Sequence, residues 1–142
     1  FRYGYPVTND NDTDRTTFGA EVLFEKDKFL LQGEYIYDKG GYNLAAGGGC
    51  GSDPILLGDK RDGAYVMGAY KVNEKFQPVL KYEFFDPNLD LKDDGSYQER
   101  FTFGFNYFFS DRVRLQVNYL ANIETVTNVD NDRLVAQMQV KF

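Results

Sequence analysis

The sequence predicts an all-β protein, an antiparallel meander of about eight strands that forms part of a transmembrane β-barrel. Two patterns predict this fold: apolar and polar residues alternate with a period of two in segments of about ten residues, and short and long connections alternate along the chain. A third observation is the content of 13 Phe and 11 Tyr among 142 residues, which would overfill the interior of a small barrel. We expect one domain over residues 1–142 and no helix.

The first four full segments of alternating residues are 16–25, 29–37, 64–72 and 76–86. In chain order, their apolar positions are Phe18, Ala20, Val22, Phe24, then Phe29, Leu31, Gly33, Tyr35, Tyr37, then Ala64, Val66, Gly68, Tyr70, Val72, then Phe76, Pro78, Leu80, Tyr82 and Phe84. Segment 64–72 has the weakest alternation, because Tyr65 and Met67 occupy its other face. Pro78 has no N–H to donate to a neighbouring strand, so it predicts a bulge or a place at the rim of the sheet.

Three further segments, 98–108, 113–122 and 133–142, complete the pattern. Their apolar positions are Phe101, Phe103, Phe105, Tyr107, then Val113, Leu115, Val117, Tyr119, Ala121, then Leu134, Ala136, Met138, Val140 and Phe142. Phe1, Tyr3 and Tyr5 indicate an eighth strand that the start of the given sequence interrupts. The chain therefore provides seven whole strands and one partial strand.

The connections between these segments differ in length at the two ends of the sheet. Short polar turns are expected at 26–28, 73–75 and 110–112, as in tight antiparallel hairpins. Long stretches cover 6–15, 38–63, 87–97 and 123–132, and all of them fall at the opposite end. Short periplasmic turns and longer external loops are the plan of an outer-membrane barrel.

We expect the apolar face of the sheet to meet lipid. A soluble barrel of the lipocalin type has the same alternation with its apolar face inward, but an eight-stranded interior is too narrow for so many rings. Facing outward, the rings would form the two aromatic girdles of a membrane barrel. The expected girdles are Tyr35, Tyr37, Phe84, Phe101 and Tyr119 at the long-loop end, and Phe24, Phe29, Phe76, Tyr107 and Phe142 at the short-turn end.

Composition argues against several classes of function. A net charge of −6 argues against nucleic acid as a partner, because phosphate binding needs a basic surface. The absence of His removes the commonest general base and the commonest metal ligand, so we expect no enzyme, no cofactor and no metal site. Cys50 lies in a glycine tract and is expected to be a loop thiol, with pairing to a cysteine outside this segment as the alternative.

One acidic stretch imitates the start of a calcium-binding loop. Residues 10–14 read Asp-Asn-Asp-Thr-Asp, but Gly is missing at the sixth position and Glu at the twelfth. With Asp93, Asp94 and residues 130–132, this stretch is expected to be a hydrated external loop. Divalent-cation binding beside lipopolysaccharide is the alternative.

Two parts of the chain resemble known proteins. Residues 133–142, which end in Phe142, resemble the C-terminal strand of bacterial outer-membrane barrels, a signal that the barrel-assembly machinery recognises. Residues 99–119 and the run 84–87, Phe-Phe-Asp-Pro, resemble the phosphate-selective porin O and P family. The resemblance implies a barrel of sixteen strands, usually a homotrimer, in the outer membrane of a Gram-negative bacterium. This chain would be its C-terminal part, with the C-terminus at the periplasmic side.

In a barrel of this family the polar face would line a water-filled pore, through which ions and other small hydrophilic solutes diffuse passively. Its expected charges are six basic residues, Lys71, Lys81, Arg100, Arg114, Arg133 and Lys141, and four acidic ones, Glu21, Glu25, Glu34 and Glu83. Since the sign of the lining charge sets selectivity, we expect a weak preference for small anions. Arg114 and Lys141 should lie on neighbouring strands, and Glu83 should lie near Arg100.

The family's phosphate specificity rests on clusters of arginine and lysine carried largely on inward-folded loops. The stretch 38–63 offers Lys39, Lys60 and Arg61 beside Asp53, Asp59 and Asp62, so we expect no phosphate site there. Outer-membrane lipid and lipopolysaccharide are the expected surroundings of the barrel. The alternative is a complete eight-stranded barrel with a packed interior that acts as a structural anchor or adhesin.

Overall fold

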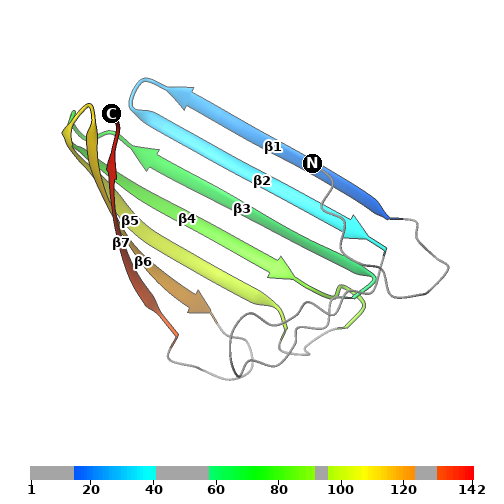
Figure 1. Ribbon diagram of the computed structural model, residues 1–142. Coiled ribbons are helices and arrows are strands. Elements are labelled where there is room, and N and C mark those ends of the chain that lie inside the picture. The colour runs from blue at the N-terminus through cyan, green and yellow to red at the C-terminus, as the bar shows by residue number, and fades with distance from the viewer. Residues whose placement is uncertain (1–14, 41–57, 92–95, 124–130) are drawn as a thin grey trace.

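The computed structural model describes residues 15–40, 58–91, 96–123 and 131–142, which form one open antiparallel sheet (Figure 1). Its seven strands follow one another in sequence order: β1 Thr16–Lys26, β2 Phe29–Lys39, β3 Lys60–Tyr70, β4 Phe76–Asp86, β5 Gln98–Ser110, β6 Val113–Ile123 and β7 Arg133–Val140. The predicted all-β meander is confirmed. The expected strand around Tyr3, the acidic stretches at 10–14 and 93–94, and Cys50 lie outside the described residues.

Within the described ranges there is no helix with the length and apolar character needed to cross a membrane.

The strand boundaries match the predicted ones at β4 and differ from them most at the start of β3. β4 has the predicted bounds, whereas β3 begins at Lys60 instead of Ala64 and ends at Tyr70 instead of Val72. The prediction was wrong at the start of β3 because Arg61 pairs with Asp38 across β2 and so extends the ladder into a stretch expected to be loop. β7 ends at Val140, not at Phe142, because its partner Val113 is the first residue of β6.

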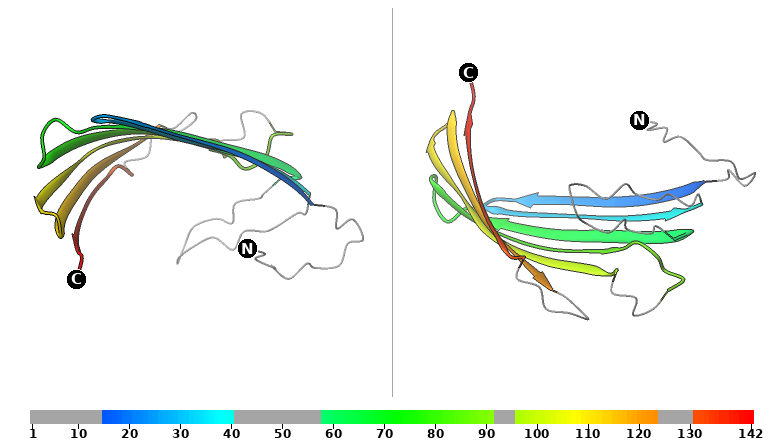
Figure 2. Two further views of the ribbon diagram at one scale, coloured as in Figure 1. Left: turned by 90° about the horizontal axis from the view of Figure 1, so that it is seen from above. Right: turned by 60° about the horizontal axis from the view of Figure 1, so that its bottom comes forward.

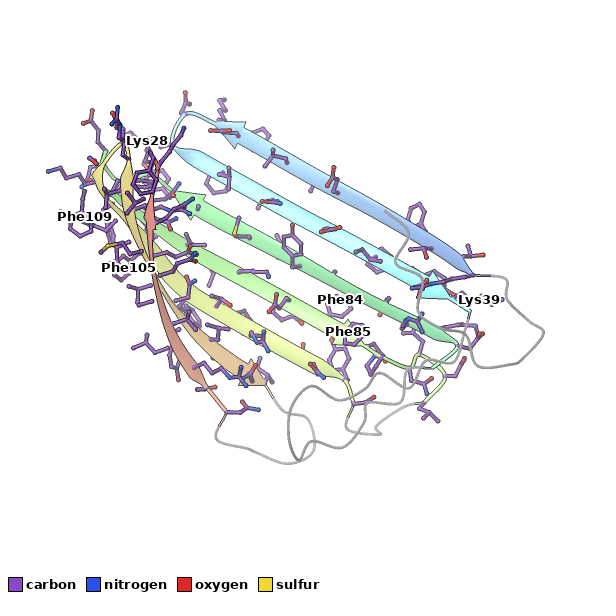
Figure 3. All side chains as sticks on the ribbon, in the orientation of Figure 1. Lys28, Lys39, Phe84, Phe85, Phe105 and Phe109 are labelled. Atoms are coloured by element: carbon purple, nitrogen blue, oxygen red, sulfur yellow. The ribbon has the colours of Figure 1, made fainter. Side chains whose placement is uncertain are left out.

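The predicted asymmetry of the connections is confirmed. Residues 27–28, 71–75 and 111–112 connect strands at one end of the sheet, while 40–59, 87–97 and 124–132 connect them at the other. β7 runs toward the short-turn end, where the C-terminus lies (Figure 1). Asp27, at a φ of 53°, takes the left-handed conformation that tight turns require and that Asp tolerates. Lys28 and Lys39, at the two ends of β2, mark the short-turn and long-loop ends (Figure 3).

The register separates the sheet into an apolar face and a polar face. Apolar residues pair with one another across the strands, as in Phe18 with Tyr37, Leu80 with Phe103 and Tyr119 with Leu134, so every predicted apolar segment contributes to the same face. The sheet curves strongly (Figure 2). At mid-height the apolar face carries Val66, Leu80, Phe103 and Tyr119, which are 44–53% exposed. Side chains spread apart on a convex surface, so we assign the apolar face to the convex side.

Ring–ring contacts stabilise the apolar face. Phe76 packs against Phe105 with ring centroids 5.5 Å apart, and Tyr82 packs against Phe101 at 4.9 Å. Such pairs add about 0.5–1.5 kcal/mol to the effect of the area that they bury. Pro78 pairs with Phe105 of β5 but lies beyond the last residue pair of β3 and β4, so its missing N–H falls at the rim. The bulge lies elsewhere, between Phe108 and Ser110 at the β5–β6 turn.

Within the described part of the chain, β1 pairs only with β2 and β7 only with β6. Each outer strand therefore presents one edge of N–H and C=O groups without a ladder partner there. A lipid bilayer offers no hydrogen bonds to such groups, so a sheet that spans it must continue on both edges into a closed barrel. This arrangement fits one part of a barrel wall.

Candidate pore-lining face

Five of the seven predicted pore-lining residues lie in strands on the polar face. They are Lys81 and Glu83 on β4, Arg100 on β5, Arg114 on β6 and Arg133 on β7. The other two lie just beyond strand ends at the short-turn end of the sheet. Lys71 follows β3, with its N–H donating to the carbonyl of Lys28, and Lys141 follows β7.

The centre of the polar face holds a cluster of three charges, Lys81, Glu83 and Arg100. Glu83 forms an ion pair with Lys81, and its Oε1 accepts a hydrogen bond from Nη1 of Arg100 at 3.1 Å. Arg100 also donates from Nε to the Oδ1 of Asn122 at 2.7 Å, which fixes the plane of its guanidinium. The Nζ of Lys81 lies 4.7 Å from the centroid of the Tyr65 ring. The predicted neighbourhood of Glu83 and Arg100 is confirmed, and the cluster keeps one excess positive charge.

The cations near the short-turn end do not form a second cluster of this kind. Arg114 donates from Nη2 to the Oε1 of Gln139 on β7 at 2.7 Å. The backbone N–H of Lys141 donates to the carbonyl of Arg112 at 2.8 Å, which places Lys141 beside the start of β6, as predicted. Arg133 pairs across the ladder with Leu120, well away from Arg114. The basic residues of β6 and β7 are therefore spread along the wall.

The structure assembles a charged cluster that sequence reasoning missed, Arg15, Asp38 and Arg61. Asp38 accepts hydrogen bonds from Nε and Nη2 of Arg15, both at 2.9 Å, from the hydroxyl of Thr17 at 2.7 Å and from Arg61. Asp38 and Arg61 are each only 6% exposed, and Arg61 also donates to the carbonyl of Gly58 at 3.2 Å. The hydrogen bond from Arg15 to Asp38 raises the pKa of the guanidinium.

A signal for this cluster was present in the sequence. Thr17, Asp38 and Arg61 continue the polar positions of their strands by steps of two, and the register places them side by side across β1, β2 and β3. The cluster ties the long-loop ends of three strands together. It has two cations on one carboxylate, so it also keeps one excess positive charge.

Uncharged amides occupy a row on the polar face nearer the short-turn end. Gln77, Asn106, Gln116 and Gln137 face one another across β4 to β7. The Nδ2 of Asn106 donates to the Oε1 of Gln77 at 3.0 Å, while Oδ1 of Asn106 is buried with no partner among the described residues. Hydrogen-bonding side chains in such a row suit a wall that meets water.

Three further acidic residues of the polar face, outside the two charged clusters, lie at one side of the sheet. Glu21 and Glu25 are on β1 and Glu34 is on β2, with Glu21 directly opposite Glu34. Basic residues dominate β5 to β7 instead. Across the described residues no group of three His, Cys, Asp or Glu side chains could hold a metal ion.

A water-compatible polar face, an apolar convex face and alternating loop lengths all belong to the wall of a membrane barrel. The family model described as "Phosphate-selective porin O and P" matches residues 6–142. The chain belongs to this family. No curated protein and no solved structure matches it significantly.

Membership in the phosphate-selective porin O and P family gives the sheet its context. The chain is a porin-type channel at the level of the family, and an outer-membrane location follows from that membership. The family resemblance expected from residues 84–87 and 99–119 is confirmed by a match that spans nearly the whole chain.

Proposed function

We propose that this porin is a passive diffusion channel for small hydrophilic solutes with a weak preference for anions. The observation that supports it most directly is the polar face of the sheet. Its described charged clusters, Lys81–Glu83–Arg100 and Arg15–Asp38–Arg61, each keep one excess positive charge, and Arg114 and Arg133 add two more. Glu21, Glu25 and Glu34 subtract three, so the described part of this face keeps one net positive charge, and Lys71 and Lys141 just beyond the strand ends raise it to three. Rings of charged side chains of one sign favour passage of the opposite sign.

The contacts of the arginines argue against a strong phosphate site in this part of the wall. Arg15 donates from Nε and Nη2 to Asp38, and Arg61 donates to Asp38 and to the carbonyl of Gly58, so both cations are already paired with a carboxylate. A phosphate bound to these arginines would lie close to that carboxylate and would be repelled by it. A weak preference for small anions in general fits these contacts better than phosphate specificity.

We also propose an orientation and an assembly route. The C-terminus lies at the short-turn end, which in outer-membrane barrels faces the periplasm. Phe142 would serve there as the assembly signal for the barrel-assembly machinery. The apolar face would meet outer-membrane lipid and lipopolysaccharide in the Gram-negative cell, and neighbouring subunits in a homotrimer.

Ion selectivity in planar bilayers tests the proposed function. The reversal potential in a KCl gradient should indicate a modest chloride preference, and the double variant Arg114→Glu/Lys141→Glu should move it toward potassium. Lys26→Glu is the matched control, because Lys26 lies at the same end of the sheet at an apolar-face position of β1. An unchanged permeability ratio in the double variant would contradict the proposed lining. A protein that carries no current at all would favour the anchor or adhesin.

A further inference from the structure

An exposed aromatic ring lies on the polar face between the two positive clusters. Phe85 of β4 is 37% exposed, and it pairs with Gly63 of β3 on one side and with Gln98 of β5 on the other. Beyond Gly63 in the same row lies Ile36 of β2, which is 44% exposed. Phe85 lies near the long-loop end of β4, next to Phe84 (Figure 3). We call Ile36, Gly63 and Phe85 the Phe85 platform. Large apolar groups exposed on a water-facing wall indicate a binding surface.

The glycine shapes this platform. A methyl group at Gly63 would lie 3.3 Å from Cδ2 of Phe85 and 3.1 Å from the carbonyl oxygen of Phe84. The ring of Phe85 therefore fills the space over the bare backbone of Gly63. Because one side of the ring packs on this backbone, the exposed third of the residue is available to a second flat ring. Aromatic rings attract one another in such offset stacks.

A charged cluster lies on each side of the platform in the direction of the strands. If a row is the set of residues that pair across the strands, the Arg15–Asp38–Arg61 cluster is one polar-face row closer to the long loops, and the Lys81–Glu83–Arg100 cluster is one polar-face row closer to mid-height. Rows on one face are about 7 Å apart, since every second residue shares a face. Each cluster keeps one excess positive charge, so an anionic group on the bound ring would be attracted.

The position of that anionic group follows from the remaining charges. Glu21 and Glu34 lie in the mid-height row on the β1 and β2 side, so they repel an anion there. Arg100 lies on the opposite side, on β5, with its side chain 39% exposed. Its Nε binds Asn122 and its Nη1 binds Glu83, and no hydrogen bond joins its Nη2 to another described residue. A carboxylate diagonal to Phe85 could accept a hydrogen bond from this nitrogen.

We infer that the Phe85 platform is a binding site for small aromatic carboxylates, with the ring stacked on Phe85 and the carboxylate held by Arg100. The inference rests on the proposed function, since it assumes that the polar face lines the pore. The β2–β3 side of the row favours an apolar ring, because Ile36 and Gly63 offer no side-chain hydrogen bond, whereas the amide of Gln98 on β5, opposite Phe85, is available only to a polar group at the edge of the ring. The site would slow and select aromatic anions as they pass.

Inhibition of chloride current by benzoate, with acetate as the reference anion, tests the inference. Benzoate should reduce the current at concentrations at which acetate does not. Phe85→Ala should raise the half-inhibitory benzoate concentration about two- to tenfold, the range expected for losing one stacked pair. Phe84→Ala is the matched control, because Phe84 is the adjacent residue on the apolar face. Phe85→Tyr should keep the inhibition, and Arg100→Gln should weaken it.

The outcomes separate this site from the channel itself. Chloride current without any benzoate effect, or equal inhibition in Phe85→Ala and the parent protein, would overturn the site and leave the channel intact. Inhibition by glucose in place of benzoate would assign the platform to sugars and overturn the inference. A parent protein without current would overturn the proposed function and the site with it. Chloride current in each variant shows that the variant has folded and inserted.

Discussion

Removing the negative charge of Glu83 should strengthen the anion preference by a predictable amount. Glu83 is shared between Lys81 and Arg100, so Glu83→Gln raises the excess charge of the cluster from one to two. A chloride ion one row away is about 7 Å from the lost charge. In water, one unit charge at that distance contributes about 0.6 kcal/mol, which corresponds to a factor of about three in chloride occupancy.

Salt screening provides a second test of the same variant. The Debye length is about 10 Å at 0.1 M salt and about 3 Å at 1 M. About half of the interaction should remain at 0.1 M, so the chloride-to-potassium permeability ratio should rise about 1.5- to threefold. At 1 M the effect should almost vanish. Reversal potentials in planar bilayers at both salt concentrations measure this change.

Glu99→Gln is the matched control for Glu83→Gln. Glu99 carries the same charge at nearly the same height, but the register places it opposite Phe84 on the apolar face, where its carboxylate accepts a hydrogen bond from Tyr82. Its removal should leave the permeability ratio unchanged. Equal shifts from the two variants, or no shift from Glu83→Gln at 0.1 M, would refute the assignment of the polar face to the pore.

Two further predictions concern stability, measured as the free energy of urea unfolding in lipid vesicles. Gly104→Ala should destabilise the sheet by about 1–3 kcal/mol, because the methyl group would lie 2.8 Å from the carbonyl oxygen of Val117. Gly68→Ala is the control and should be neutral or stabilising, because no atom lies within 4 Å of its methyl group. Equal effects of the two substitutions on the free energy of unfolding would contradict the register. Asp38→Asn should cost about 3–5 kcal/mol, because it breaks a buried charged cluster. Asp90→Asn, in an exposed pair with Lys60, should cost less than about 1 kcal/mol, and similar losses would contradict the burial of Asp38.

The strands and their faces could be predicted from the sequence because both depend on local alternation. Phe101, Phe103 and Phe105 fall on one face of any extended strand, whatever its neighbours are. The nearness of Glu83 to Arg100 could also be predicted, since both are polar positions near the long-loop ends of consecutive strands, and consecutive strands are neighbours in a meander. The apolar phase of β3 is confirmed by the pairing of Val66 with Gly33 and Tyr82.

The cluster around Asp38 could not be predicted in the same way. Asp38 and Arg61 both continue the polar phase of their strands, but the long connection between them leaves open where each strand ends and begins and which residues face each other. Only the pairing of β2 with β3 shows that both residues belong to strands and that they face each other. The Phe85 platform could not be predicted for a related reason. Phe85 is an aromatic residue at a polar position of its strand, so the alternating pattern gives it no role, and its packing on Gly63 follows only from the register of β3 and β4.

Cysteine accessibility along β5 tests the central claim most directly, namely that the polar face meets water and the apolar face meets lipid. In a Cys50→Ser background, single cysteines at Arg100, Phe101, Thr102 and Phe103 would be exposed to a membrane-impermeant thiol reagent in intact outer membranes. We predict modification at Arg100 and Thr102 and protection at Phe101 and Phe103. The reverse alternation, or equal modification at all four positions, would contradict the claim.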